Sequence, residues 1–218
     1  MGKLIVFEGV DGSGKSTQYK RLCDRLEKQG VTFRRLVFPR YSEPSSALIR
    51  MYLAGEFGDK PGDVNPYAAS AFFAVDRYAS YVQDWRAFYQ AGGLVVTDRY
   101  TTSNAVHQAS KLPPEERESF LHWLFEFEYT RMGLPVPDLV LFVDVDLETA
   151  LSHLRKREAE TDTKADIHER DEAYLSTSIS AARTAAQLYG WKRLDGSASV
   201  EEIAAQTARE TEMLWKQA

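Results

Sequence analysis

One stretch decides the fold of this chain: Phe7-Glu8-Gly9-Val10-Asp11-Gly12-Ser13-Gly14-Lys15-Ser16-Thr17. Four of its positions fit G-x-x-x-x-G-K-[ST], the phosphate-binding loop: Gly9, Gly14, Lys15 and Ser16. An apolar run from Leu4 to Phe7 predicts a short buried strand before it, and a helical pattern follows, so the motif has the strand–loop–helix context that it requires. The glycines let backbone N–H groups turn inward toward an anion, and the start of the helix adds positive charge. The sequence therefore predicts a nucleoside triphosphate site.

The loop supplies the residues expected to hold the nucleoside triphosphate. Lys15 is expected to reach the β- and γ-phosphates, and the Ser16 hydroxyl to complete the shell of a Mg²⁺ ion. The alternative, a glycine-rich turn with a solvated lysine, does not explain why all four positions match in the right context. The residues expected to bind this nucleotide are Gly9, Val10, Asp11, Gly12, Ser13, Gly14, Lys15, Ser16 and Thr17.

Length and composition bound the class of protein. The chain has 218 residues, of which 44% are hydrophobic, so we expect one globular domain over residues 1–218. A net charge of −5 argues against a general nucleic-acid or membrane-surface binder. The single cysteine, Cys23, excludes an internal disulfide and favours a reduced compartment. No apolar run is long enough to span a bilayer and no signal peptide is recognised, so we expect a cytoplasmic protein.

Predicted helices and strands alternate along the whole chain. Strands are predicted at residues 4–7, 33–38, 94–97, 139–143 and 191–194, and helices at 15–29, 44–53, 66–91, 114–133, 148–157, 172–189 and from 200 onward. This alternation is typical of an α/β fold with one parallel sheet covered on both faces. Such sheets bind ligands beyond the carboxyl ends of their strands. There we expect the phosphate-binding loop, Arg40 and Asp98-Arg99 to converge.

Three further features favour a kinase that phosphorylates a nucleotide. Asp11 lies inside the loop, where a carboxylate could hydrogen bond an acceptor hydroxyl or simply stabilise the loop. Asp98 follows an apolar strand, where P-loop enzymes carry a carboxylate associated with Mg²⁺. Phe73 and Arg77 lie four residues apart on one helical face, so they could stack on a base and hydrogen bond its carbonyl, unless they belong to the core. The guanine-reading Asn-Lys-x-Asp pattern of GTPases is absent.

Together these residues resemble the thymidylate kinase family, essentially from end to end. The motifs that carry the resemblance are the loop with its internal acid, Phe38-Pro39-Arg40, Phe73 to Arg77, Asp98-Arg99-Tyr100 with Ser103-Asn104, Gly133 to Leu139, Arg155-Lys156-Arg157 and Asp195. The resemblance implies ATP-dependent conversion of dTMP to dTDP, in the supply of dTTP. It also implies a P-loop kinase fold with five parallel strands, a short lid at about residues 155–170, and a homodimer formed through helix faces.

The resemblance assigns roles to individual residues. Phe73 would stack on thymine, Arg77 would hydrogen bond its carbonyl, and Asn104 would lie near the ring. Arg40 and Arg99 would hold the acceptor phosphate, Asp11 the 3′-hydroxyl, and Asp98 the Mg²⁺ shell together with Ser16. The expected substrate-binding residues are Asp11, Phe38, Arg40, Tyr41, Phe73, Arg77, Arg99, Ser103, Asn104 and His107. The expected catalytic residues are Lys15, Asp98, Arg99, Arg155 and Arg157.

Two positions differ from the family's usual pattern. His107 stands where members commonly have Tyr or Phe beside the sugar, which opens the question of deoxyribose selection. The phosphate-binding loop carries no arginine, so the catalytic cation is expected from the lid, with Arg157 favoured over Arg155, and Arg170 as a further candidate. A regulatory ATPase, and a kinase of another nucleotide or of a sugar, stay open as alternatives.

Overall fold

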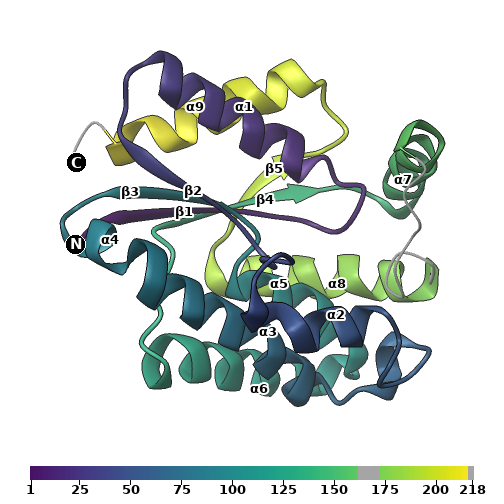
Figure 1. The fold of residues 1–218 in the computed structure, drawn as a ribbon. Helices are drawn as coiled ribbons and strands as arrows, with labels where there is room; N and C mark the ends of the chain where they lie inside the picture. The colour runs from purple at the N-terminus through teal and green to yellow at the C-terminus, as the bar shows by residue number, and fades with distance from the viewer. Residues whose placement is uncertain (162–171, 216–218) are drawn as a thin grey trace.

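Five parallel strands form the centre of the molecule in a computed structural model, which describes residues 1–161 and 172–215. The sheet order is β2-β3-β1-β4-β5, and every neighbouring pair is parallel. The strands are β1 (Lys3–Glu8), β2 (Phe33–Val37), β3 (Leu94–Asp98), β4 (Leu139–Asp144) and β5 (Lys192–Asp195). Figure 1 shows helices on both faces of this sheet, which confirms the predicted α/β class and the five-stranded parallel sheet.

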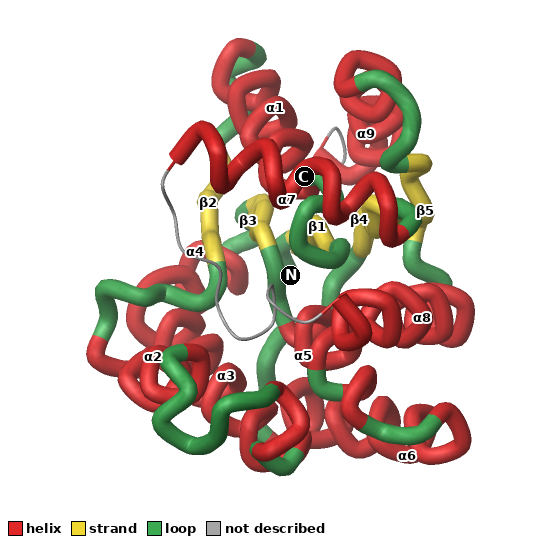
Figure 2. Tube along the Cα trace, turned by 90° about the vertical axis from the view of Figure 1, so that its right-hand side faces the viewer, coloured by secondary structure: helices red, strands yellow, loops and turns green. Residues whose placement is uncertain are grey.

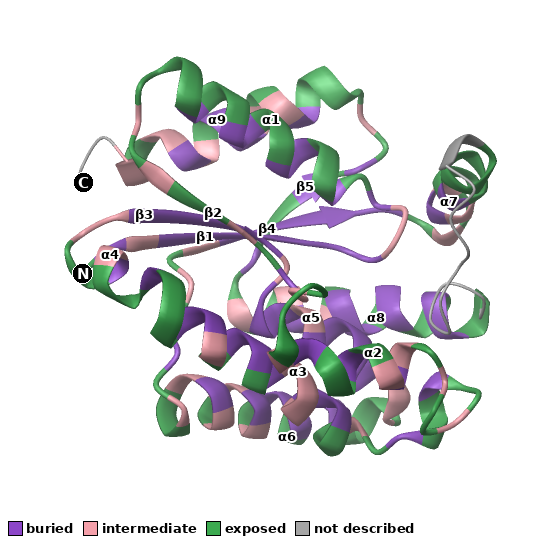
Figure 3. Cartoon of the chain, viewed as in Figure 1, coloured by how far each residue is buried: buried purple, intermediate pink, exposed green. Residues whose placement is uncertain are grey.

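The helices divide into two unequal layers. One face of the sheet carries α1 (Lys15–Lys28) and α9 (Val200–Trp215) (Figure 1). The thicker layer on the other face contains α2 (Ala47–Leu53), α3 (Pro66–Ser80), α4 (Arg86–Gln90), α5 (Thr101–His107), α6 (Pro114–Phe125) and α8 (Glu172–Tyr189). The middle strands are buried on both faces (Figure 3), because each face has its own apolar core. Continuous apolar runs are what strands in such a sheet require.

The carboxyl ends of the strands meet at one edge of the sheet. Figure 2 looks at this edge and shows α7 (Leu147–Thr161) lying across it. The phosphate-binding loop leaves β1 here and leads directly into α1, as predicted. No helix in the described ranges 1–161 and 172–215 combines the length and apolarity that a bilayer span requires.

Two predicted long helices each contain a π-helical segment. The predicted helix 66–91 is α3, then Tyr81–Trp85 in π geometry, then α4. Its buried residues Arg77, Tyr81, Trp85 and Tyr89 recur every fourth position. In an α-helix of 3.6 residues per turn that spacing drifts by about 40° at each step. The wider π turn offsets the drift and keeps these side chains toward the same core. Residues 114–133 likewise become α6 followed by a π segment at Glu126–Arg131.

Two helix predictions need correction. The helix predicted at 148–157 is α7, which extends to Thr161, and Glu158 and Ala159 are good helix formers. No element was predicted between residues 100 and 111, yet α5 lies there with six of its seven residues buried, so packing overrides the weak helix propensity of its threonines and asparagine. Residues 162–170 of the predicted lid, including Arg170, lie outside the described residues.

The start of α3 offers a test of how local sequence stabilises this fold. Asn65 caps the helix, because its side-chain oxygen accepts hydrogen bonds from the N–H groups of Tyr67 (2.8 Å) and Ala68 (3.3 Å). We expect Asn65→Ala to lower the free energy of unfolding by about 1 kcal/mol in urea titrations. Asn65→Asp is the matched control, since a carboxylate also caps. Equal stability of the alanine variant and the wild type would contradict the assignment.

Candidate active site

A cavity of about 910 Å³ lies at the carboxyl edge of the sheet. It runs from the phosphate-binding loop to α3 and α5 on one side, and to α7 and the segment after β5 on the other. Predicted site residues that line it are Asp11, Gly12, Ser13, Gly14, Lys15, Ser16, Thr17, Phe38, Tyr41, Phe73, Arg77, Asp98, Arg99, Ser103, Asn104, His107 and Arg157. Gly9, Val10, Arg40 and Arg155 are not among the lining residues.

The phosphate-binding loop is held in shape by backbone geometry and by α7. Gly12 and Gly14 have φ angles of 79° and 84°, in the left-handed region that favours glycine. A Cβ at Gly12 would clash with the backbone of Ala150 on α7, so this glycine allows close approach of the two segments. His153 of α7 reinforces the contact, with its Nδ1 at 2.7 Å from the Gly12 carbonyl oxygen. Sequence reasoning missed His153, because its loop partner lies 141 positions away.

Lys15 lies in the loop's concave side, buried among oxygen atoms. Its Nζ is 3.3 Å from the Val10 carbonyl oxygen and 3.5 Å from the Asp11 carboxylate. These are long contacts, and a triphosphate would supply better acceptors at the same place. The geometry therefore fits the predicted role of Lys15 toward phosphate.

Arg99 is fixed by acidic and aromatic neighbours. Its backbone has φ 68°, unusual for a residue with a side chain, and Thr97 Oγ1 donates to its carbonyl oxygen at 2.8 Å. The guanidinium forms a short ion pair with Asp11, lies 3.9 Å from Glu8 Oε1, and contacts His107 Nε2 at 3.0 Å. Burial lowers the pKa of Arg99, but the nearby carboxylates more than offset this and raise it above the ordinary value. Arg99 is thus a charged, oriented donor at the cavity wall.

His107 contacts two other residues, Arg99 and Tyr174, that the sequence analysis did not connect with it. Besides its contact with Arg99, its ring stacks on Tyr174 at 6.3 Å between centroids, and the Tyr174 hydroxyl donates to its carbonyl oxygen at 2.7 Å.

Glu8, which the sequence analysis did not select, lies beneath this part of the site. It is fully buried and accepts hydrogen bonds from Thr102 and Ser103, each at 2.7 Å.

Asp98 has the features expected of a residue near a divalent cation. It is 6% exposed and lines the cavity together with Ser16, and its Oδ1 is buried and accepts no hydrogen bond within the described part of the chain. A buried carboxylate oxygen without a donor is costly unless a ligand satisfies it. No group of three or more acidic, His or Cys residues in the described ranges could hold a metal alone. This pattern fits Mg²⁺, which binds through one or two protein oxygens plus phosphates.

The far end of the cavity presents an aromatic ring and two polar groups. Phe73 and Arg77 of α3 both line it, as their four-residue spacing predicted. Arg77 is 2% exposed and pairs with Glu128, with Nε and Nη2 at 2.7 and 2.5 Å from the two carboxylate oxygens. Burial lowers the pKa of Arg77, and Glu128 reverses the effect, so the net shift is upward. Asn104 of α5 also donates to Glu128, at 3.1 Å.

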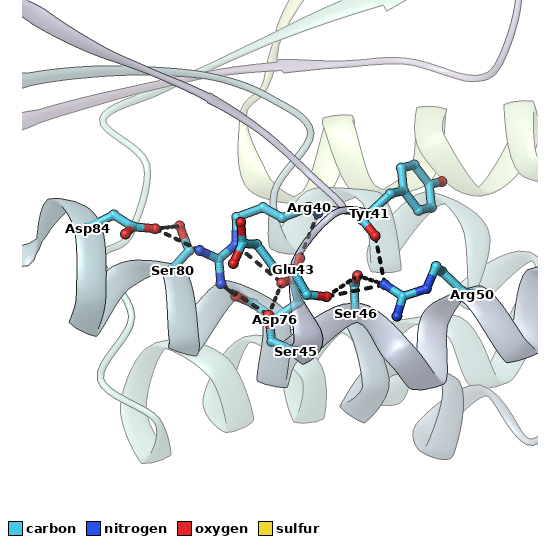
Figure 4. Close-up of polar contacts among 9 residues, drawn as sticks. All are labelled: Arg40, Tyr41, Glu43, Ser45, Ser46, Arg50, Asp76, Ser80 and Asp84. Carbon is cyan, nitrogen blue, oxygen red and sulfur yellow. Dashed lines mark hydrogen bonds and ion pairs between the residues drawn. The ribbon is translucent and has the colours of Figure 1, made fainter.

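Arg40 lies in a network beside the cavity (Figure 4). Its Nε is 3.2 Å from Asp76 Oδ1, its Nη1 is 2.6 Å from Asp84 Oδ2, and its Nη2 is 3.1 Å from the Ser45 hydroxyl. All three guanidinium nitrogens therefore have protein partners. The Tyr41 ring points away from Arg40 in the same view. That Arg40 binds the acceptor phosphate stays a prediction.

The two arginines of α7 are placed differently. Arg157 lines the cavity, on the same wall as His153 and Lys156. The Arg155 side chain is 74% exposed and lies 3.7 Å from Glu172 at the start of α8. Arg157, the favoured candidate for the catalytic cation, therefore reaches the cavity in this structure, and Arg155 does not.

Comparison with known proteins places this cavity in a family context. A sequence model of the family described as thymidylate kinase matches residues 7–207. The chain is 35% identical over 201 residues to "Thymidylate kinase" of Mycobacterium tuberculosis strain H37Rv, covering 91% of this chain and 92% of that protein. It is 30% identical over 210 residues to "Probable thymidylate kinase" of Pyrobaculum aerophilum, covering 94% of each chain.

The role of Asp98 at the ion site can be tested, because its buried Oδ1 accepts no hydrogen bond within the described residues. Asp98→Asn removes the negative charge that would attract the ion, so we expect the Mg²⁺ concentration for half-maximal activity to rise by about 10- to 100-fold. Asp144→Asn is the matched control, because Asp144 also ends a strand of the sheet, β4, but pairs with Arg183 and Arg193 and does not line the cavity. A Mg²⁺ titration of turnover gives the answer. The same dependence of turnover on Mg²⁺ concentration in both variants would show that Asp98 does not contribute to the ion site.

Proposed function

Because the chain belongs to the thymidylate kinase family, we propose that this cavity transfers the γ-phosphoryl group of ATP to dTMP. The products are ADP and dTDP, on the route to dTTP. ATP phosphates bind the loop at Lys15, and dTMP lies between Arg99 and the Phe73–Arg77 end of the cavity. We treat residues 1–218 as one kinase domain.

One observation carries this assignment. The phosphate loop and a donor–acceptor pair suited to a pyrimidine base, Arg77 and Asn104, line opposite parts of a single cavity, with Arg99 on its wall. A simple ATPase has no use for a second, base-reading end. Arg77 is already held by Glu128, so the donor is oriented before a ligand arrives. Preorganised donors of this kind are what positioning catalysis requires.

The reaction needs no protein base. A phosphate monoester has a second pKa of about 6, so the attacking oxygen of dTMP is largely anionic at neutral pH. Lys15 neutralises charge on the donor phosphates, Arg99 orients the attacking phosphate, and Asp11 accepts a hydrogen bond from the 3′-hydroxyl. Ser16 and Asp98 would hold Mg²⁺, which would supply positive charge to neutralise the phosphates.

The acceptor is tested by a panel of nucleoside monophosphates. We expect the highest kcat/KM for dTMP, because cytosine presents an amino group where thymine presents a carbonyl and would leave Arg77 facing a donor. Losing this bond costs on the order of 1–3 kcal/mol, or roughly ten- to a hundredfold in selectivity. A coupled assay of ADP formation measures it. Higher kcat/KM for dCMP or AMP than for dTMP would refute the assignment.

Arg157 is the proposed source of catalytic positive charge, supported by its place on the cavity wall. We expect Arg157→Ala to lower kcat by at least about tenfold with little change in the KM for dTMP, because the contact forms fully in the transition state. Arg155→Ala is the matched control, since that side chain is exposed and faces Glu172. Near-normal kcat in the Arg157 variant, measured at saturating substrates, would contradict the proposal.

We also propose that the enzyme is a homodimer that works in the cytoplasm and binds no nucleic acid. Support for self-association comes from exposed apolar residues at helical spacing along α3 and the π segment after it. Val75, Tyr78 and Val82 are 50%, 43% and 36% exposed. The net charge of −5 and the single reduced thiol, Cys23, support the other two points.

The dimer proposal has its own test. Val75→Glu would bury a charge in the interface, so we expect light scattering to show a dimer for the wild type and a monomer for the variant. Met213→Glu is the control, because Met213 is 63% exposed on α9, on the opposite face of the sheet (Figure 1). A monomeric wild type, or a dimeric Val75→Glu variant, would reject this face as the interface.

A further inference from the structure

Glu128 is a buried carboxylate that gathers the polar groups at the base end of the cavity. It is fully buried in the π segment after α6. Arg77 occupies both of its oxygens, Thr101 donates to Oε2 at 2.8 Å, and Asn104 Nδ2 donates to Oε1 at 3.1 Å. It thus receives four hydrogen bonds from α3 and α5, and none of the roles assigned above belongs to Glu128 itself.

The carboxylate dictates which way the Asn104 amide faces. The nitrogen of Asn104 lies 3.1 Å from Glu128 Oε1 and 3.2 Å from the Ser70 carbonyl oxygen. Both neighbours are acceptors only, so the group between them must be the NH₂ and not the oxygen. A reversed amide would bring its oxygen against two others. The Asn104 Oδ1 is left for the cavity, which this residue lines.

The Glu128 carboxylate also fixes the orientation of the Arg77 guanidinium group. Because Nε and Nη2 are bound to Glu128, Nη1 is the nitrogen that makes no hydrogen bond within the described part of the chain. The base end therefore presents a donor from Arg77 and an acceptor from Asn104. Thymine and uracil carry the complementary pair, a carbonyl oxygen beside an N–H. Cytosine carries the reverse, an amino group beside a bare ring nitrogen.

We propose that Glu128 is a positioning residue that sets the choice of base, by imposing one orientation on both Arg77 and Asn104. It touches neither substrate nor reacting atoms and acts through these two side chains. The proposal rests on the proposed function, since it concerns how a thymine-like base is told from cytosine. It explains why a carboxylate is buried here among donors from two helices.

The test is Glu128→Gln, assayed with both dTMP and dCMP. An amide has one acceptor where the carboxylate has two, so it cannot satisfy both Arg77 donors together with Asn104. We expect the ratio of kcat/KM for dTMP over dCMP to fall by about tenfold or more, mainly through a raised KM for dTMP. Affinity for a non-hydrolysable ATP analogue should not change, because the phosphate loop is untouched.

Glu126→Gln is the matched control. Glu126 lies in the same π segment, but its side chain is 55% exposed and pairs with Arg131 at the surface. A loss of selectivity shared by both variants, or an unchanged ratio in a folded Glu128→Gln variant, would overturn the proposal. A wild type that does not prefer dTMP would instead refute the proposed function, so the two failures are distinguishable.

A second variant decides the matter if Glu128→Gln does not fold. Asn104→Asp is isosteric and can still offer an oxygen to the base, but it places a second oxygen against Glu128. Glu128 would then face an oxygen where it now accepts a hydrogen bond from the Asn104 NH₂. We therefore expect this variant to lose about tenfold or more in kcat/KM for dTMP and to keep its affinity for the ATP analogue. Full activity with dTMP would show that Asn104 needs no orienting acceptor, and would overturn the proposal.

Discussion

The alignment of parallel strands at one edge of the sheet is the constraint on which the site depends. In the register, Phe7 of β1 and Val37 of β2 both pair with Asp98 of β3. The ladder continues one step further, because Arg99 N–H donates to the Phe7 carbonyl at 3.0 Å and Phe38 N–H donates to the Asp98 carbonyl at 3.1 Å. Segments distant in sequence therefore leave the sheet at the same level, and a slip of one residue would turn their side chains to opposite faces.

Carboxylates then hold the cationic groups at that edge in fixed positions. Arg99 is bound by Asp11 and Glu8, Arg77 by Glu128, and Arg40 by Asp76 and Asp84. The net charge of −5 gives no generally basic surface, so the proposed binding of an anionic substrate rests on donors that are oriented locally. Ordering them during folding leaves less conformational entropy to lose when ligands bind.

The sequence predicted local features well and distant partnerships poorly. The phosphate-binding loop and the Phe73–Arg77 pair follow from spacing within one element, and the strands from continuous apolar runs. Glu128 could not be found in this way, because it contacts Arg77 across 51 positions and lies among aromatic residues in a helical pattern. The same holds for His153 against Gly12 and for the network around Arg40. In each case the fold, and not the local pattern, selects the partner.

The most direct test of phosphoryl transfer to dTMP is to follow a mixture of enzyme, ATP, Mg²⁺ and dTMP by ³¹P NMR. We expect the γ-phosphate signal of ATP to be replaced by the β-phosphate signal of dTDP, in equal amount to the ADP that forms, with no inorganic phosphate. Release of inorganic phosphate while dTMP stays unchanged would show an ATPase and contradict the assignment.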